Sequence, residues 1–209
     1  MHVKTFLTGP LSVNTYLIYA DETGEACVID PGDAETVISF CAERDLRVSA
    51  ILLTHGHFDH IGGADTIRDR YGSLVYVHGE DMAMLADARQ NLSLPFLGRA
   101  VTCMAGETMT DGMTLSLLGT EVHVLHTPGH TRGGVSFVWD SLKMIFTGDT
   151  LFRLGAGRTD FPGGSFEELS ASIRRLFGLD GEWAVMPGHG EASTLSLERS
   201  RNPFVRYSH

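Results

Sequence analysis

Cysteine is scarce in this chain of 209 residues, which contains only Cys27, Cys41 and Cys103. Their odd number, their wide spacing and the absence of any Cys-x-x-Cys pair exclude both a disulfide framework and a cysteine-based zinc site. We therefore expect the three thiols to be small, buried apolar residues.

Long hydrophobic runs are also missing. The longest uncharged stretch near the start, residues 6–20, is interrupted by glycine, proline, serine and asparagine, whereas a membrane span needs about 20 predominantly apolar residues. The first residues contain no apolar core of the kind that a secretory signal requires. These absences predict a protein that does not enter a membrane and that lies in the cytoplasm.

Basic residues are outnumbered, since 16 Lys and Arg face 26 Asp and Glu for a formal net charge of −10. Without any longer basic run than the pair Arg174 and Arg175, nucleic acid is disfavoured as a partner. No linker or low-complexity tract divides the chain, so we expect one domain over residues 1–209. Its expected partner is a small-molecule substrate, and its expected state is a monomer or small homo-oligomer.

The pattern of apolar residues predicts a mixed α/β chain. Short β-branched or aromatic runs that end at Gly, Pro, Asp or Thr are typical of strands. These runs are residues 16–19, 26–29, 50–53, 74–77, 122–125, 135–139, 144–146 and 183–186. Amphipathic spacing predicts helices at 34–45 and 166–177, with further candidates at 61–71, 80–89 and 193–201.

The densest chemical signal is Thr-His-Gly-His-Phe-Asp-His at residues 54–60, directly after a predicted strand. His55 and His57 are two positions apart, so in an extended segment both imidazoles project from the same side and can reach one metal ion. Asp59 and His60 follow where the next helix begins, so they turn away from the first pair. This spacing predicts two adjacent metal sites.

Further ligands must come from distant parts of the chain, and three candidates share one local pattern. His130, Asp149 and His189 each lie just past a strand end on a glycine-containing turn, where loops commonly carry functional groups. A carboxylate such as Asp149 can give one oxygen to each of two metals. We therefore expect His55, His57 and His130 on one ion, Asp59, His60 and His189 on the other, and Asp149 shared.

A purely structural metal site is the alternative, but such sites are usually closed and rich in cysteine, which favours catalysis here. Zinc is the expected metal, with iron or manganese left open because histidine and carboxylate ligands suit all three. Asp30 and Thr54 are candidates for orienting a ligand imidazole. The remaining histidines, His2, His78, His123, His126 and His209, are assigned no role.

These motifs carry a resemblance. His-x-His-x-Asp-His at 55–60, Thr-Pro-Gly-His at 127–130, Gly-Asp at 148–149 and Pro-Gly-His-Gly at 187–190 resemble the metallo-β-lactamase superfamily. Segments 9–16, 28–32, 155–161 and 198–204 are similar to its glyoxalase II-like (hydroxyacylglutathione hydrolase-like) branch. The resemblance implies an αββα sandwich of four layers, with the metals at one sheet edge.

The resemblance also implies a substrate. Arg158 matches a basic residue that lies near the substrate in this branch, so it is expected to meet a glutathione carboxylate. Glyoxalase II proteins carry a helical domain after the last ligand, which is missing from this sequence; the chain is thus similar to a short, single-domain bacterial variant. Glutathione specificity therefore does not transfer as a whole.

The function expected on this basis is hydrolysis of a thioester, S-lactoylglutathione or a related 2-hydroxyacyl thioester, by a metal-bound hydroxide. Asp149 bridges the two divalent ions, and Asp59 is a ligand and a candidate acceptor for the proton of the attacking water. The rival implied by the resemblance is a mononuclear iron glutathione-persulfide dioxygenase that uses positions matching His55, His130 and Asp149. Nuclease chemistry is disfavoured by the acidic charge, whereas β-lactam or lactone hydrolysis stays open.

Overall fold

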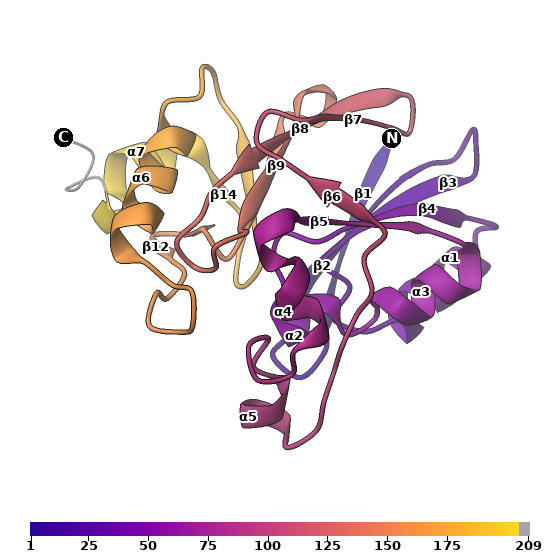
Figure 1. Cartoon of the computed structure of the whole chain (residues 1–209). Coiled ribbons are helices and arrows are strands. Elements are labelled where there is room, and N and C mark those ends of the chain that lie inside the picture. The colour runs from indigo at the N-terminus through magenta and orange to yellow at the C-terminus, as the bar shows by residue number, and fades with distance from the viewer. Residues whose placement is uncertain (205–209) are drawn as a thin grey trace.

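Two six-stranded β-sheets that pack face to face form the centre of the protein (Figure 1), seen here in a computed structural model that describes residues 1–204. The first sheet has the order β1-β2-β3-β4-β5-β6; β1 to β3 are antiparallel neighbours, and β3 to β6 are parallel. Its strands are β1 (His2–Thr8), β2 (Val13–Ala20), β3 (Glu25–Ile29), β4 (Arg47–Leu52), β5 (Leu74–His78) and β6 (Glu107–Met109).

The second sheet has the order β14-β13-β10-β9-β8-β7. Only one pair of neighbours, β10 and β13, runs parallel, because a helical crossover separates these two strands in the chain. Its strands are β7 (Thr114–Leu117), β8 (Thr120–His126), β9 (Val135–Trp139), β10 (Met144–Gly148), β13 (Ala184–Pro187) and β14 (Ser193–Thr194). A small two-stranded sheet, β11 (Leu151–Phe152) with β12 (Gly155–Ala156), follows β10.

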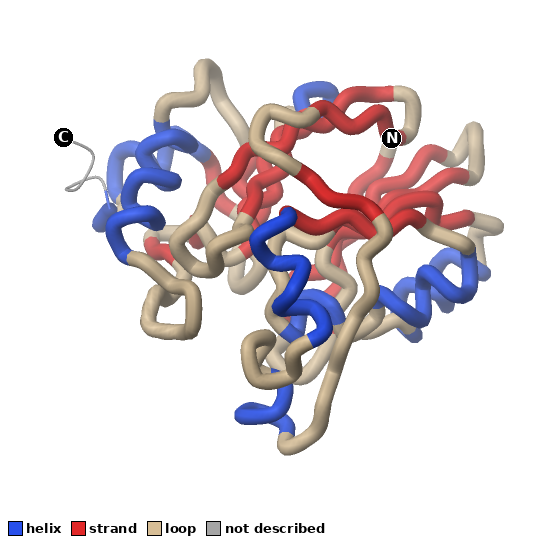
Figure 2. Tube along the Cα trace, viewed as in Figure 1, coloured by secondary structure: helices blue, strands red, loops and turns tan. Residues whose placement is uncertain are grey.

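Helices cover the outer face of each sheet, as Figure 2 shows with strands in red between helices in blue. On the first sheet lie α1 (Glu35–Ala42) and α3 (Ala64–Tyr71), and on the second lie α6 (Phe166–Phe177) and α7 (Leu195–Arg201). Three short helices, α2 (Phe58–Ile61), α4 (Met82–Ala86) and α5 (Ser93–Leu97), and two 3₁₀ turns, η1 (Gly79–Asp81) and η2 (Asp140–Leu142), complete the described elements.

Alternation along the strands explains these layers. In β2, Leu17 packs into the cluster that faces α1 and α3, whereas Tyr16 and Ile18 pack into the cluster between the two sheets. Across that gap, Phe137 and other inward side chains of the second sheet complete the central core. Because side chains point alternately to the two faces of a strand, one strand serves both layers. The expected αββα sandwich of mixed α/β class is confirmed.

The eight predicted strands are all present, but four of the five helix predictions need correction. The predicted helix at 61–71 is interrupted, because α2 ends at Ile61 and α3 begins at Ala64 after two glycines. The helix expected at 34–45 ends at Ala42, since Asp45 adopts a left-handed backbone with φ of 53°. In the segment 80–89 a 3₁₀ turn precedes a helix that ends at Ala86, and the segment 193–201 begins as strand β14.

The three cysteines are buried and free, as expected. Among the described residues, no helix combines the length and the apolar character needed to cross a membrane.

Candidate metal centre

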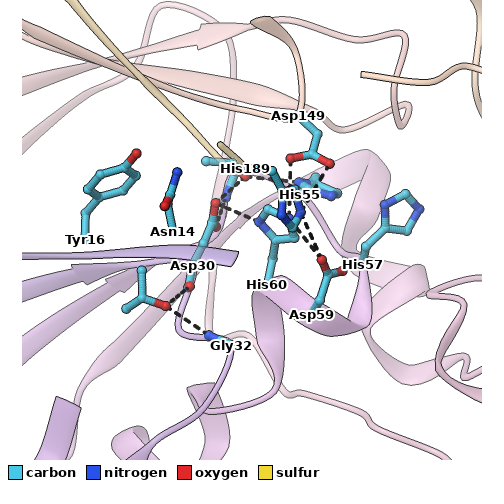
Figure 3. A network of polar contacts seen from close by, with 12 residues as sticks. Asn14, Tyr16, Asp30, Gly32, His55, His57, Asp59, His60, Asp149 and His189 are labelled. Carbon is cyan, nitrogen blue, oxygen red and sulfur yellow. Dashed lines mark hydrogen bonds and ion pairs between the residues drawn. The ribbon is translucent and has the colours of Figure 1, made fainter. Parts of the chain in front are cut away.

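The predicted ligands converge on one edge of the sandwich, where several strands of both sheets end. Figure 3 labels all of these ligands except His130. His55 and His57 follow β4, and Asp59 and His60 lie on α2. The others come from the second sheet: His130 follows β8, Asp149 follows β10, and His189 follows β13. The strands thus form a rigid frame, and the short turns after them place the functional side chains.

The first donor group consists of His55, His57 and His130, whose ligand atoms lie within 4.8 Å of one another. His57 Nδ1 and His130 Nε2 are 3.0 Å apart. His130 Nδ1 lies 2.7 Å from the backbone oxygen of Arg158. A carbonyl only accepts, so Nδ1 carries the proton and Nε2 keeps a lone pair directed toward the group.

The second donor group consists of Asp59, His60 and His189. His189 Nε2 lies 3.2 Å from Asp59 Oδ2, and His60 Nε2 lies 3.6 Å from the same oxygen. Asp59 and His60 are buried, whereas the side chain of His189 is 27% exposed. This group is therefore accessible from the side of His189.

Asp149 lies between the two groups. Its Oδ2 is 3.5 Å from His130 Nε2 and 3.8 Å from His189 Nε2, and its Oδ1 is 3.5 Å from His60 Nε2. His55, His60 and Asp149 also form a third possible donor group, so His55 lies between the two sets and not on one side only. The carboxylate of Asp149 therefore lies beside ligand atoms of both groups.

Unpartnered polar atoms at this place fit a metal-binding site. In residues 1–204, the buried side-chain atoms without a hydrogen-bond partner are Nε2 of His55, His57 and His60 and Oδ1 of Asp149. Leaving such atoms buried and unpaired is costly, and all four belong to the predicted ligand set. The donor set of histidine and carboxylate is also one that zinc, iron and manganese accept.

Asp30 anchors one imidazole of the centre. Its carboxylate accepts hydrogen bonds from Thr54 N at 2.7 Å and Thr54 Oγ1 at 2.6 Å. It also lies 2.9 Å from His60 Nδ1, which leaves Nε2 of His60 directed at the metal position. Asp30 and Thr54 therefore occupy the orienting positions expected of them.

Burial and charge set the protonation of the ligands. Burial, reinforced by neighbouring imidazoles, lowers the pKa of His55 and of His57 well below the usual range, so both are neutral donors. Burial also opposes a charge on His60, but the carboxylates of Asp59, Asp30 and Asp149 outweigh it and raise its pKa to about 10. The same carboxylates would stabilise a metal cation at this position.

Close packing around Asp149 requires a residue without a side chain at Gly188. A Cβ at this position would lie 2.3 Å from Asp149 Oδ1 and 2.8 Å from Cε1 of His60. Only a residue without a side chain lets the turn before His189 pass so close to the other ligands.

The sequence did not reveal two supports of the centre. Buried Asp81 accepts hydrogen bonds from Gly56 N at 3.0 Å, Thr131 Oγ1 at 2.7 Å and Gly133 N at 2.7 Å, and so joins the loops that carry His57 and His130. It has no motif that could have identified it.

The second support is formed by β2. Asn14 Nδ2 donates to the oxygens of Pro187 and Gly190 at 2.9 Å each, and Tyr16 donates to Pro187 O at 2.7 Å. These bonds hold the turn that contains His189, and Figure 3 shows Asn14 and Tyr16 beside it. Both lie in the segment 9–16 that carried the resemblance, which was the available signal.

Arg158 lines the cavity at the centre, although its guanidinium pairs with Asp160. The histidines without an assigned role lie apart from the donor groups: His78 and His126 stack on each other with ring centroids 4.1 Å apart, His2 pairs with Asp21, and His123 contacts Thr114. His209 lies outside the described residues.

A four-layer sandwich with a histidine and aspartate cluster at one edge defines a class of metal-binding hydrolase folds. The chain belongs to the metallo-beta-lactamase superfamily, whose family model matches residues 8–189. Among curated relatives, the Haemophilus influenzae protein named hydroxyacylglutathione hydrolase GloC is 36% identical, over 98% of this chain and 98% of its own.

Solved structures agree on the fold. The BLEG-1 B3 metallo-beta-lactamase superposes with a TM-score of 0.93 at 38% identity, over 98% of this chain and 99% of its own. TTHA1623 in a di-iron-bound form superposes with a TM-score of 0.84 at 37% identity, over 98% of this chain and 100% of its own.

Proposed function

We propose that this protein is a metal-dependent hydrolase that cleaves a thioester, S-lactoylglutathione or a related 2-hydroxyacyl thioester, to an acid and a thiol. The observation that carries the proposal is the pair of donor groups with Asp149 between them, at the base of an open cavity. The H. influenzae relative, which is similar along nearly its whole length, supports the thioester as the substrate class.

Two divalent ions held by the seven proposed ligands, His55, His57, Asp59, His60, His130, Asp149 and His189, would supply a water of lowered pKa and polarise the substrate carbonyl. Zinc is the proposed metal; the di-iron form of TTHA1623 supports iron as an alternative.

The chain's own groups then serve the reaction in distinct ways. Asp59 is the candidate acceptor of the proton that the attacking water releases; it is buried, and its Oδ2 lies between His60 Nε2 and His189 Nε2. Asp149 orients both halves of the centre. A thiol with a pKa of about 8.5 leaves as the thiolate without a strong acid, so the chain needs no further proton donor.

Two rivals share the same fold. A mononuclear iron glutathione-persulfide dioxygenase would consume oxygen, whereas the complete second group of Asp59, His60 and His189 supports a centre of two metals. β-Lactam hydrolysis is supported by the similarity to the BLEG-1 enzyme. Fold and metal ligands alone do not select the acyl group.

The proposal also covers the localisation, the oligomeric state and the partners of the protein. We place it in the cytoplasm as a single-domain monomer or small homo-oligomer, acting on a small molecule and not on nucleic acid or a membrane. The acidic net charge of −10 supports the exclusion of nucleic acid.

Anaerobic turnover of S-D-lactoylglutathione tests the function. We expect hydrolysis without oxygen, loss of hydrolysis after chelation, and recovery when zinc is returned, because only the metals supply the nucleophile. Thiol release is followed with a chromogenic disulfide. Oxygen uptake with glutathione persulfide, together with no thioester hydrolysis by fully metallated protein, would overturn the proposal in favour of the dioxygenase; hydrolysis of a β-lactam alone would favour the lactamase.

A further inference from the structure

The cavity beside the metal centre has a volume of about 360 Å³, within the range of small-molecule sites. Five of the proposed ligands form its base, and the surrounding walls are largely apolar. We call Leu11, Leu92, Phe96, Phe152 and Phe161 the apolar wall. This combination of a polar base and hydrocarbon sides limits what the cavity can bind.

The apolar wall is assembled from separate parts of the chain. Leu11 lies in the turn between β1 and β2, Phe96 lies on α5, and Phe161 follows β12. The rings of Phe96 and Phe161 meet edge to face with centroids 5.9 Å apart, and Phe161 lies 5.9 Å from the ring of His57. The aromatic pair therefore extends from the cavity mouth to the ligands.

Two members of this wall are unusually exposed. Phe96 is 51% exposed and Leu11 is 45% exposed, and both face the same cavity. Clustered exposed apolar side chains around a concave site are typical of a surface that is covered when a ligand binds. An apolar ligand group would remove this area from water.

The cavity offers few charged side chains that could recognise a charged group of the substrate. Apart from the proposed metal ligands, Arg158 is the one charged side chain that lines this cavity within residues 1–204. Its guanidinium makes two hydrogen bonds of 2.6 Å to the carboxylate of Asp160 and stacks over Phe161, with Cζ 3.9 Å from the ring centroid. An anionic substrate group would have to compete with Asp160 for it.

We propose that the apolar wall selects the acyl group of the substrate: the enzyme prefers thioesters whose 2-hydroxyacyl group carries an apolar chain or ring, with Phe96 and Phe161 as specificity-determining residues. This inference rests on the proposed thioesterase function and narrows its substrate class. An anionic thiol such as glutathione contributes little to binding while Asp160 holds Arg158.

A substrate series with one neutral thiol tests the preference. The S-lactoyl, S-2-hydroxyhexanoyl and S-mandeloyl thioesters of N-acetylcysteamine are compared by kcat/KM with the zinc-loaded protein. A fully buried methylene is worth about 0.8 kcal/mol, or about fourfold, so we expect the hexanoyl ester to exceed the lactoyl ester by at least about tenfold. Equal values across the series would overturn the proposal.

Variants of single residues test whether the apolar wall causes the preference for a longer acyl group. Phe96→Ala should lower kcat/KM for the longer ester by a larger factor than for the lactoyl ester, and so remove most of the advantage of the longer ester. The matched control is Phe166→Ala, because Phe166 is 48% exposed but lies outside the lining of this cavity. Asp160→Asn should raise kcat/KM for S-lactoylglutathione but not for the neutral thioester. A full advantage in Phe96→Ala, or the same loss in Phe166→Ala, would contradict the assignment.

A binding measurement separates this proposal from the thioesterase function. Calorimetry with the thioethers S-hexyl- and S-methyl-N-acetylcysteamine requires no hydrolysis. Tighter binding of the hexyl compound, weakened by Phe96→Ala, supports the apolar wall even if no thioester is cleaved. Equal affinities would overturn the wall proposal while leaving the hydrolase proposal to its own assay.

Discussion

Individual hydrogen bonds decide which nitrogen of each imidazole faces the metal position. His60 is the clearest case, because Asp30 holds Nδ1 at 2.9 Å and leaves Nε2 unpartnered in the interior. The same carboxylate also accepts two bonds from Thr54, whose neighbour is His55. One buried carboxylate thus orients a ligand of the second donor group and fixes the chain beside a ligand of the first.

Asp30→Asn should weaken metal binding without unfolding the protein. The amide retains the shape but replaces one acceptor with a donor, so it cannot accept all three hydrogen bonds. Asparagine also tolerates the left-handed backbone at this position, where φ is 50°. We expect metal affinity to fall by about 10- to 100-fold, measured as metal per chain in buffers of fixed free zinc.

Asp33→Asn is the control for this change, since Asp33 bonds to backbone groups of Gly9 and Thr36 and not to a ligand. Wild-type zinc affinity in Asp30→Asn, or an equal loss in Asp33→Asn, would show that orientation of His60 does not matter.

At this scale, the sequence was informative where chemistry is dense. Four ligand-type residues within positions 55–60 and three strand-end turns identified the residues that the structure brings together. Asp81 could not be found in the same way, because it acts on backbone amides of Gly56 and Gly133. Almost every residue has a backbone amide, so these two bonds leave no motif, and the third donor to Asp81 is the side chain of the distant Thr131.

Among the elements, α6 and the turn before His130 are packed with no intervening space. A Cβ on Gly129 would lie 2.1 Å from the backbone nitrogen of Leu169, which is on α6. The turn is also bound through Ser165 N, which donates to Gly129 O at 2.8 Å, and through Ser172 Oγ, which donates to Pro128 O at 2.7 Å. The position of His130 therefore depends on the position of this helix.

Gly129→Ala should destabilise the fold more than an ordinary left-handed glycine would. The control is Gly119→Ala, because Gly119 has φ of 74° with nothing within 4 Å of an added Cβ, whereas Gly129 has φ of 127° and a clash. We expect the free energy of unfolding to fall by about 1–3 kcal/mol more in Gly129→Ala, from overpacking. Urea unfolding measures the free energy of unfolding of both variants. Equal losses would mean that α6 can move away from an added Cβ without destabilising the fold.

Elements with a strong pattern were predictable, and those held by tertiary contacts were not. The residues of α6 were identified to the ends of the helix because its apolar stripe is regular and Ser165 caps it. The edge strand β1 was missed since most of its residues are exposed. The short helix α5 begins after Leu92 in a left-handed conformation, which no local preference of leucine favours.

At the scale of the whole molecule, the metal centre takes its ligands from both sheets. The first sheet supplies His55, His57, Asp59 and His60 from one end of β4, and the second supplies His130, Asp149 and His189. Metal ions bound there would bridge the two halves, so binding should stabilise the entire fold by mass action. The sandwich itself was predictable only through the resemblance, because strand periodicity does not reveal which strands pair across the chain.

Removal of metal should lower the melting temperature. Free metal at 100 times the dissociation constant stabilises a protein by about 2.7 kcal/mol, which corresponds to about 5–10 °C for a chain of this size. We expect chelation to cause a shift of that order, measured by thermal unfolding followed by circular dichroism.

Asp149→Ala should melt near the chelated wild type and show no further shift with chelator. His126→Ala, outside the donor groups, should respond as the wild type does. A chelator shift of full size in Asp149→Ala would refute the shared ligand.

The hydrogen bonds from Asn14 to the turn around His189 bear on the order in which the chain folds and binds metal. Asn14 and Pro187 are separated by 173 positions in the sequence, and contacts of such separation form after local ones. His55 and His57 are synthesised early, but the turn with His189 comes much later in the chain. Binding of the full set of metal ions would therefore be a late step, because the last donors reach their places only when the fold is nearly complete.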